Sequence, residues 1–186
     1  MTARQIAETA IRDHKANQRV SELEQLVEIV KRLKPSRVLE IGSQDGGTLW
    51  AWSQVAADDA VLVSVDLPDP SYQHTPMRRH KRGDQVLAVI QADSTDPATA
   101  YLAESALGNE PVDFLFIDAD HSYEAVSRDW ANYSPLVRPG GVVALHDTAC
   151  CTGVTQLWDE VKTDGYLEFV AAEDGFGACG IGVVFV

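Results

Sequence analysis

The stretch RVLEIGSQDGGT, residues 37–48, decides how this chain folds. Its first five residues form a short apolar run typical of a strand, and Gly42 follows at the point where a side chain would block a ligand. Gly46 and Gly47 then begin a helix, whose first backbone N–H groups have no partner within the helix. This order of strand, glycine loop and helix starts an alternation that continues along the chain.

Short apolar runs alternate with segments of helical periodicity in the rest of the sequence. The predicted strands are residues 37–41, 61–66, 86–91, 112–118 and 142–147, and the helices lie near 46–57, 97–107, 122–134 and 153–164. Helices that cover both faces of a parallel sheet leave its strands with unbroken apolar runs. The alternation therefore predicts a doubly wound α/β fold.

Both ends of the chain add to this core. Residues 1–35 form a helical segment, because apolar residues recur at helical spacing until a proline ends the run. The tail holds two further strands, 166–171 and 180–186, and the Gly-rich link 173–180 is too short for a crossover helix. We therefore expect one domain, residues 1–186, with a seven-stranded, mostly parallel sheet whose last strand lies antiparallel beside the fifth.

Composition restricts the partners of this chain. The 186 residues carry a net charge of −13, which repels the phosphates of nucleic acids and anionic membrane surfaces. The sequence shows no signal peptide and no apolar stretch of the roughly 20 residues that a membrane span needs. We expect a cytoplasmic protein with a small-molecule partner, no nucleic acid and no membrane. A homodimer is compatible with the sequence.

The three cysteines do not form a disulfide framework, because their number is odd and two are adjacent. Cys150 and Cys151 could be a redox or metal-binding pair. Without a CxxC spacing, we expect them to be small apolar fillers after a strand.

Ligands of a doubly wound sheet bind at the carboxyl ends of its strands, so acidic residues there are candidate site residues. Asp66 ends the second strand, where its carboxylate can accept hydrogen bonds from both hydroxyls of a ribose, or begin a turn before Pro68. Asp93 and Ser94 follow the third strand. Asp93 either binds a ligand or belongs to the cap region of the helix near Pro97.

The most distinctive stretches follow the fourth strand: FIDADHSYEAV at 116–126 and SPLVRPGGVVALHDT at 134–148. Together with the Glu-x-Gly-x-x-x-Gly loop at 40–46 and Asp66, they resemble the class I S-adenosylmethionine-dependent methyltransferases. Within that class they resemble the small bacterial O-methyltransferases related to macrolide-sugar and catechol-type enzymes. The resemblance covers roughly residues 36–150. It implies a Rossmann-like fold and S-adenosylmethionine as cofactor.

The resemblance also implies which residues bind that cofactor. The glycine loop passes close to the methionine part, Asp66 binds the ribose and Asp93 binds the adenine amino group. The implied cofactor-binding residues are Glu40, Gly42, Ser43, Gly46, Gly47, Asp66, Asp93, Ser94 and Asp118. Gln44 breaks the Gly-x-Gly-x-x-Gly fingerprint, which argues against NAD.

Asp118 and Asp147 end two strands that are neighbours in the predicted sheet, where adjacent strands lie about 4.8 Å apart. Two close carboxylates repel, so either one is protonated or a positive charge lies between them. A hard cation such as Mg²⁺ would satisfy both, and the metal-dependent O-methyltransferases carry ligands at these two places. Thr148, a weaker ligand, stands where that family commonly has a third amide or acid. Asp120 either completes the site or caps the next helix, and we favour the cap.

His121 is the candidate general base, and Asp118 is the second candidate catalytic residue. Methyl transfer to a hydroxyl requires removal of its proton, and an imidazole with a pKa near 6.5 suits that task. In the related macrolide-sugar enzymes a histidine three residues after the fourth-strand aspartate takes this role. The alternative is a capping or buried, hydrogen-bonded histidine. His14 and His80 are expected to be solvated.

Two functions follow from the sequence. The first is O-methylation of a small hydroxylated acceptor, a sugar or a phenol, with metal assistance. The alternative is a non-catalytic accessory domain that binds S-adenosylmethionine or another nucleotide. The basic cluster at residues 78–82 either meets an anionic ligand or is a solvated surface.

Overall fold

The structure is a computed structural model that describes the whole chain except residues 69–79, 163 and 172–176. Arg78 and Arg79 of the basic cluster therefore lie outside the described residues. None of the described helices is long and apolar enough to cross a membrane.

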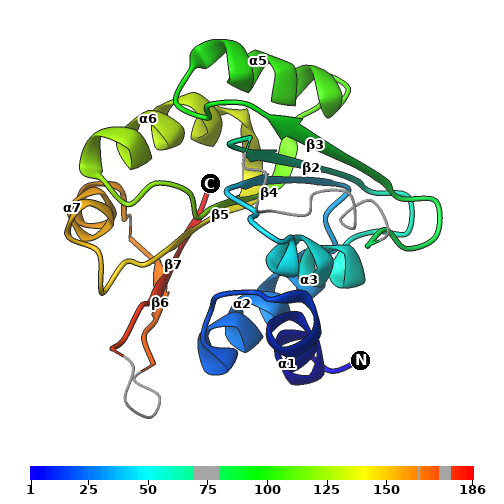
Figure 1. Ribbon diagram of the computed structural model, residues 1–186, viewed down its shortest axis with the longest axis horizontal. Helices are drawn as coiled ribbons and strands as arrows, with labels where there is room; N and C mark the ends of the chain where they lie inside the picture. The colour runs from blue at the N-terminus through cyan, green and yellow to red at the C-terminus, as the bar shows by residue number, and fades with distance from the viewer. Residues whose placement is uncertain (69–79, 163, 172–176) are drawn as a thin grey trace.

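A seven-stranded sheet of order β3-β2-β1-β4-β5-β7-β6 forms the centre of the molecule (Figure 1). The strands are β1 (Arg37–Ile41), β2 (Val61–Asp66), β3 (Val86–Gln91), β4 (Val112–Ile117), β5 (Val137–His146), β6 (Leu167–Phe169) and β7 (Ile181–Phe185). The first five run parallel, and β7 lies antiparallel between β5 and β6. The predicted fold class and the place of the last strand are confirmed. β5 begins five residues before the predicted bound of 142, and β6 is shorter than predicted.

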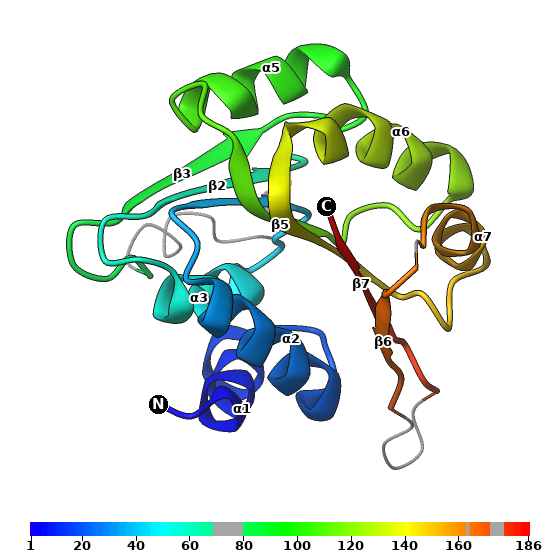
Figure 2. The same ribbon diagram turned by 180° about the vertical axis from the view of Figure 1, so that it is seen from behind.

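The helices form two layers, one on each face of the sheet (Figures 1 and 2). One layer holds α1 (Ala3–His14), α2 (Val20–Leu33) and α3 (Gly47–Val55). The other holds α5 (Pro97–Ala106), α6 (Tyr123–Tyr133) and α7 (Thr152–Val161), with the short 3-10 helix η1 (Ser134–Leu136) after α6. Each layer covers apolar strand residues, which is why the strands lack a polar face.

Successive strand residues supply the two cores alternately, because side chains along a strand point to opposite faces. In β4, Phe114 and Phe116 pack in the core under α1–α3, and Leu115 and Ile117 pack in the core under α5–α7. All four are buried. Burial on both faces fixes the register of the central strands, and with it the position of their carboxyl ends.

The link between α1 and α2, residues 15–19, lies against the start of α3. A Cβ atom added to Gly47 would lie 2.3 Å from the backbone N of Ala16. The N-terminal segment is therefore seated on the glycine loop rather than projecting from the domain.

Glu22 of α2 connects the N-terminal segment to the tail. Its fully buried carboxylate accepts hydrogen bonds from the backbone N–H groups of Ala171 (2.7 Å) and Gly180 (3.1 Å). These two residues flank the end of β6 and the start of β7. Segments near the two ends of the chain are thus held together beside the same sheet edge.

His14 and His80 differ from their expected solvated setting. His80 is partly buried, which lowers its pKa to about 4, and its ring meets that of His14 edge-on at 4.9 Å. His14 in turn stacks on Trp50 at 4.3 Å. Arg82, in the described part of the basic cluster, pairs with Asp58 at 2.6 Å.

The contact between Gly47 and Ala16 gives the first prediction. Gly47→Ala should lower the free energy of unfolding by about 1–3 kcal/mol, because the added methyl group overpacks the link against α3. This loss should outweigh the gain of about 1 kcal/mol in helix propensity. The control is Gly177→Ala, whose added Cβ atom would have no neighbour within 4 Å. Its free energy of unfolding, measured like that of Gly47→Ala by urea denaturation, should stay within about 0.5 kcal/mol of the parent value. Equal stability of the two variants would show that the link is not seated on Gly47.

Candidate active site

Just beyond the carboxyl ends of β1 and β4, the two backbones leave no room for a side chain at residue 42. A Cβ atom on Gly42 would lie 2.1 Å from the backbone O of Asp118, and Gly42 has a φ of +84°. Only glycine fits both the space and the conformation. Two cavities lie at this crossing, and Gly42 and Asp118 line both of them.

The larger cavity has a volume of about 500 Å³ and lies over the ends of β1 to β4 and the start of α6. This volume is within the usual range for small-molecule sites. The predicted cofactor residues that line it are Gly42, Asp66, Asp93, Ser94 and Asp118. Five of the nine predicted cofactor residues thus line one cavity, and their contact with a cofactor stays a prediction.

Asp66 holds the glycine loop against the end of β2. Its Oδ2 accepts hydrogen bonds from the backbone N–H groups of Ser43 (2.9 Å) and Gln44 (2.5 Å). Its Oδ1 accepts from the N–H of Leu67 at 2.8 Å. Each carboxylate oxygen can accept more than one hydrogen bond, so a role toward a ribose is compatible with this arrangement and stays a prediction.

Asp93 forms a turn at the edge of the larger cavity. Its Oδ1 accepts from the N–H of Thr95 (2.9 Å) and from the Thr95 hydroxyl (2.8 Å), and these bonds lower its pKa. The cap of α5 is Asp96, which accepts from Ala98 N–H at 2.9 Å. Helix α6 supports the turn from below, because the Tyr133 hydroxyl donates to the carbonyl of Ser94 at 3.0 Å.

Glu40 and Gly46 are not among the lining residues of either cavity. Glu40 is fully buried behind the loop, where it accepts a hydrogen bond from Trp52 Nε1 at 2.9 Å. Burial raises the pKa of Glu40 to about 8. Gly46 is the N-cap of α3 with a φ of +84°. Both support the loop, and their predicted contact with a cofactor stays a prediction.

The smaller cavity, of about 200 Å³, lies between the α1–α2 link and the ends of β4 and β5. Among its lining residues are Gln18, Gly47, Asp118, His121, His146, Asp147 and Cys179. The side-chain amide of Gln18 donates to Asp118 Oδ2 at 2.7 Å. The sequence analysis missed Gln18, because a polar residue in a link between two helices has no local pattern that marks it.

Asp118 and Asp147 do come together, and an imidazole lies between them. His146 Nδ1 is 3.1 Å from Asp118 Oδ1 and 3.4 Å from Asp147 Oδ1. His121 Nε2 is 2.8 Å from Asp147 Oδ2 and 4.0 Å from Asp118 Oδ1. The positive charge that the two carboxylates require is thus supplied by histidine. In the sequence, the one sign that His146 supplies this charge is its position directly before Asp147.

The four groups determine one another's protonation. Burial works against a charged His146, but Asp118 and Asp147 outweigh it and raise the pKa of His146 to about 11. Asp118 and Asp147 also raise the pKa of His121 to about 10. Burial tends to raise the pKa of each carboxyl, but the histidines hold both below the usual range. At neutral pH the site therefore contains two carboxylates and two imidazolium rings.

This charge balance changes what His121 can do. An imidazolium has no free lone pair, so His121 cannot accept a proton while both carboxylates keep their full charge. Its predicted role as general base requires a ligand or ion that first reduces the negative charge beside it.

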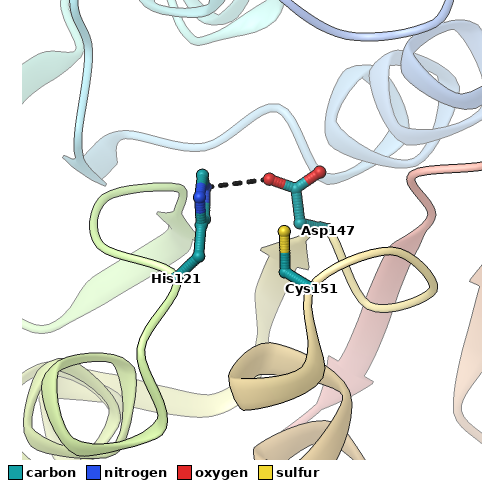
Figure 3. Close-up of side chains that lie close together, drawn as sticks. All are labelled: His121, Asp147 and Cys151. Atoms are coloured by element: carbon teal, nitrogen blue, oxygen red, sulfur yellow. Dashed lines mark ion pairs between the residues drawn. The ribbon is translucent and has the colours of Figure 1, made fainter.

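The turn after β5 brings two thiols to Asp147, as Figure 3 shows for Cys151. Asp147 has a φ of +62°, so the chain reverses sharply. The N–H groups of Cys150 and Cys151 return to the Asp147 carbonyl at 3.4 and 3.2 Å. The Cys150 thiol lies 3.0 Å from Asp147 Oδ1. The expected role of the pair as apolar fillers is wrong for Cys150, which is exposed and contacts a carboxylate.

Asp120 behaves as the sequence suggested, whereas the place of Thr148 at a third metal-ligand position stays a prediction. Asp120 accepts from the N–H of Ser122 at 2.7 Å, and Ser122 is the N-cap of α6, so Asp120 belongs to the helix cap. Thr148 is buried, and its hydroxyl has no hydrogen-bond partner among the described residues.

Comparison with known proteins places the chain among methyltransferases. Rhamnosyl O-methyltransferase of Mycobacterium tuberculosis is 26% identical over 130 residues, which are 69% of this chain and 52% of the relative. Caffeoyl-CoA O-methyltransferase of Stellaria longipes is 26% identical over 125 residues, or 64% of this chain and 49% of that protein. The chain thus spans about half the length of these relatives.

Solved structures agree with the fold. The MycE methyltransferase from the mycinamycin biosynthetic pathway, in complex with Mg, SAH and mycinamycin VI, superposes with a TM-score of 0.68 at 16% identity. That match covers 100% of this chain and 53% of MycE. The O-methyltransferase TomG from Streptomyces achromogenes gives a TM-score of 0.68 at 16% identity and covers 98% of this chain and 88% of TomG. At this identity the likeness concerns the fold alone.

A family model described as a methyltransferase domain matches residues 39–148, which include the glycine loop, Asp66, Asp93, Asp118, His121 and Asp147. Because this match covers more than half of the sequence, the chain belongs to the methyltransferase-domain family.

Proposed function

We propose that this chain is an S-adenosylmethionine-dependent O-methyltransferase that acts on a small hydroxylated acceptor, a sugar or a phenol. The observation that carries the proposal is the pair of cavities that meet at Gly42 and Asp118. One has the polar lining that a nucleoside needs, and the other contains the cluster of acids and imidazoles. The names of the rhamnosyl and caffeoyl-CoA relatives support oxygen as the methylated atom.

The larger cavity would hold the adenosine part of the cofactor. Asp93 and Ser94 would bind the adenine, and Asp66 would bind the ribose. Gly42 would let the backbone approach the sulfur without a side chain between them, and Gly47 would face the methionine part from the smaller cavity. When bound, S-adenosylmethionine supplies an electrophilic methyl group on a sulfonium centre.

The smaller cavity would hold the acceptor hydroxyl. His121, Asp118 and Asp147 surround this position, and together with His146 their charges sum to about zero at neutral pH. The residues would orient the hydroxyl for in-line attack, and His121 would take up its proton once a ligand or ion reduces the negative charge beside the ring.

The site also fits a divalent cation at Asp118 and Asp147. Two carboxylates of neighbouring strands already share one positive ring, and a cation would take over that role while His146 released its proton. The cation would lower the pKa of the acceptor hydroxyl. Mg²⁺ at this place stays a prediction, and so do the cytoplasmic location, the homodimer and the single domain over residues 1–186.

The alternative function, an accessory domain that binds the cofactor without catalysis, predicts a different behaviour. Such a domain would bind S-adenosylmethionine and show no turnover with any acceptor. The cluster around Asp147 favours catalysis, because cofactor binding alone requires no acid–base groups beside the methyl position.

Calorimetry with S-adenosylmethionine tests the cofactor site. Asp66→Ala should raise the Kd by roughly 10–100-fold, because a charge-assisted hydrogen bond contributes about 1.5–3 kcal/mol and the loop loses its anchor. Asp59→Ala, an exposed aspartate just before the other end of β2, is the control and should bind normally. Unchanged affinity of Asp66→Ala, or binding of NAD in place of S-adenosylmethionine, would contradict the cofactor assignment.

Turnover of a panel of sugars and phenols tests the acceptor side. His121→Ala should lower kcat by something like 10²–10⁴-fold with little change in the Kd of S-adenosylmethionine, because the activating group at the hydroxyl is lost. Tyr123→Phe is the matched control. It removes a hydroxyl two residues away that contacts only Glu160, at 2.9 Å, among the described residues, and it should keep its activity. A fully active His121→Ala variant would make His121 a structural residue.

A further inference from the structure

Three different ligand types converge on one point beside the smaller cavity. His121 Nε2, a carboxylate oxygen of Asp147 and Cys151 Sγ all lie within 4.8 Å of one another. Figure 3 shows the three side chains facing a common space. They come from the segment after β4, the end of β5 and the N-cap of α7.

We infer that His121, Asp147 and Cys151 bind a transition-metal ion of the zinc class. The binding of the ion rests only on these three side chains, and its role in activating the acceptor rests on the proposed function. Neither Cys151 nor the use of His121 as a ligand follows from the two-carboxylate site predicted from the sequence.

The donor atoms select this class of ion. Mg²⁺ requires near-octahedral oxygen ligands, whereas zinc accepts imidazole nitrogen, thiolate sulfur and carboxylate oxygen together. Zinc lies about 2.0–2.3 Å from such ligands, so their atoms should be roughly 3–4 Å apart around a tetrahedral ion. Movements of about 1 Å would bring the three atoms to that spacing. The His121 side chain is 48% exposed, and its ring could move by this amount if the ion took the place of its pairing with Asp147.

Asp147 is held in the orientation that the ion requires. Its Oδ1 contacts the thiol of Cys150 (3.0 Å) and the ring of His146 (3.4 Å), whereas its Oδ2 meets His121 (2.8 Å). Metal-binding carboxylates are commonly positioned by such outer contacts. The left-handed backbone of Asp147 adds to this, because it turns the chain so that Cys151 lies beside the same carboxylate.

Two other groups share Asp147 and are weaker candidates. Asp118, His146 and Asp147 also lie within 4.8 Å, but this group offers two carboxylates and no thiolate, a set that suits a harder ion than zinc. Asp147, Cys150 and Cys179 meet the same distance limit. That group lacks an imidazole, and Cys150 already contacts the Asp147 oxygen that faces away from His121.

A site with three protein ligands leaves a fourth position free, as in catalytic rather than structural zinc sites. His121 and Asp147 both line the smaller cavity, so the ion would lie at the place proposed for the acceptor. It would act there as a Lewis acid. His121 would then serve as a ligand, which removes the difficulty that its ring carries a proton at neutral pH in the absence of an ion.

Metal titration of the chelator-treated full chain tests the inference without any enzyme assay. Zn²⁺ should bind with a stoichiometry of one ion per chain and far more tightly than Mg²⁺. Co²⁺, used as a spectroscopic probe, should show the thiolate charge-transfer band of a cysteine ligand. Tighter binding of Mg²⁺, or a cobalt spectrum without a thiolate band, would overturn the inference.

Cysteine variants identify the ligand set. Cys151→Ser should abolish the thiolate band and lower the affinity for Zn²⁺ by more than about 100-fold, because loss of even an outer-shell partner typically costs 10–100-fold. Cys179→Ser, the matched control, should keep both properties. A loss in Cys179→Ser with an intact Cys151→Ser variant would assign the ion to the Asp147, Cys150 and Cys179 group and overturn the inference.

The two proposals fail separately. Asp66→Ala should bind Zn²⁺ like the parent chain, because Asp66 lies in the other cavity. Zinc binding through Cys151 in a chain that does not bind S-adenosylmethionine would leave the metal site standing and remove the proposed function. A chain that binds S-adenosylmethionine but not zinc would leave the proposed function standing and remove the metal site.

Discussion

The contact between Gly42 and the backbone of Asp118 is the constraint on which the site depends. With 2.1 Å between a virtual Cβ on Gly42 and the carbonyl oxygen of Asp118, β1 and β4 can meet only if residue 42 has no side chain. The contact is possible because both strands are buried on both faces and paired in register. It brings the start of the glycine loop against Asp118, and both of these residues line the two cavities.

The electrostatics of the site follow from burial as much as from charge. The chain carries a net charge of −13, yet the acidic cluster at the ends of β4 and β5 is neutral as a group, because His121 and His146 each hold a proton beside Asp118 and Asp147. Two unpaired carboxylates this close and this far buried would repel each other and be destabilising. Any cation that enters must therefore displace protons, which links metal binding, protonation and acceptor activation in one equilibrium.

The fold was predictable because its signals are local. The apolar strand runs, the glycine loop and the short link before β7 each depend on a few adjacent residues, and together they gave the sheet and the antiparallel last strand. Asp66, Asp93, Asp118 and Asp147 were found because strand ends are readable in the same way. His146, Gln18 and the thiols near Asp147 were missed or misinterpreted. Their roles depend on a left-handed turn and on a link from the other end of the chain.

The two cavities differ in where their walls come from. Among the residues that the structure describes, those that line the larger one all lie between Gly42 and Arg128, within the stretch 39–148 that matches the family model. The smaller one adds the α1–α2 link and Cys179, which lie outside that stretch. Glu22 holds the α2 end of the link to the tail through Ala171 and Gly180, so the two outer segments form one wall. The larger cavity thus lies within the stretch that matches the family model, whereas the smaller one also requires the segments on either side of it.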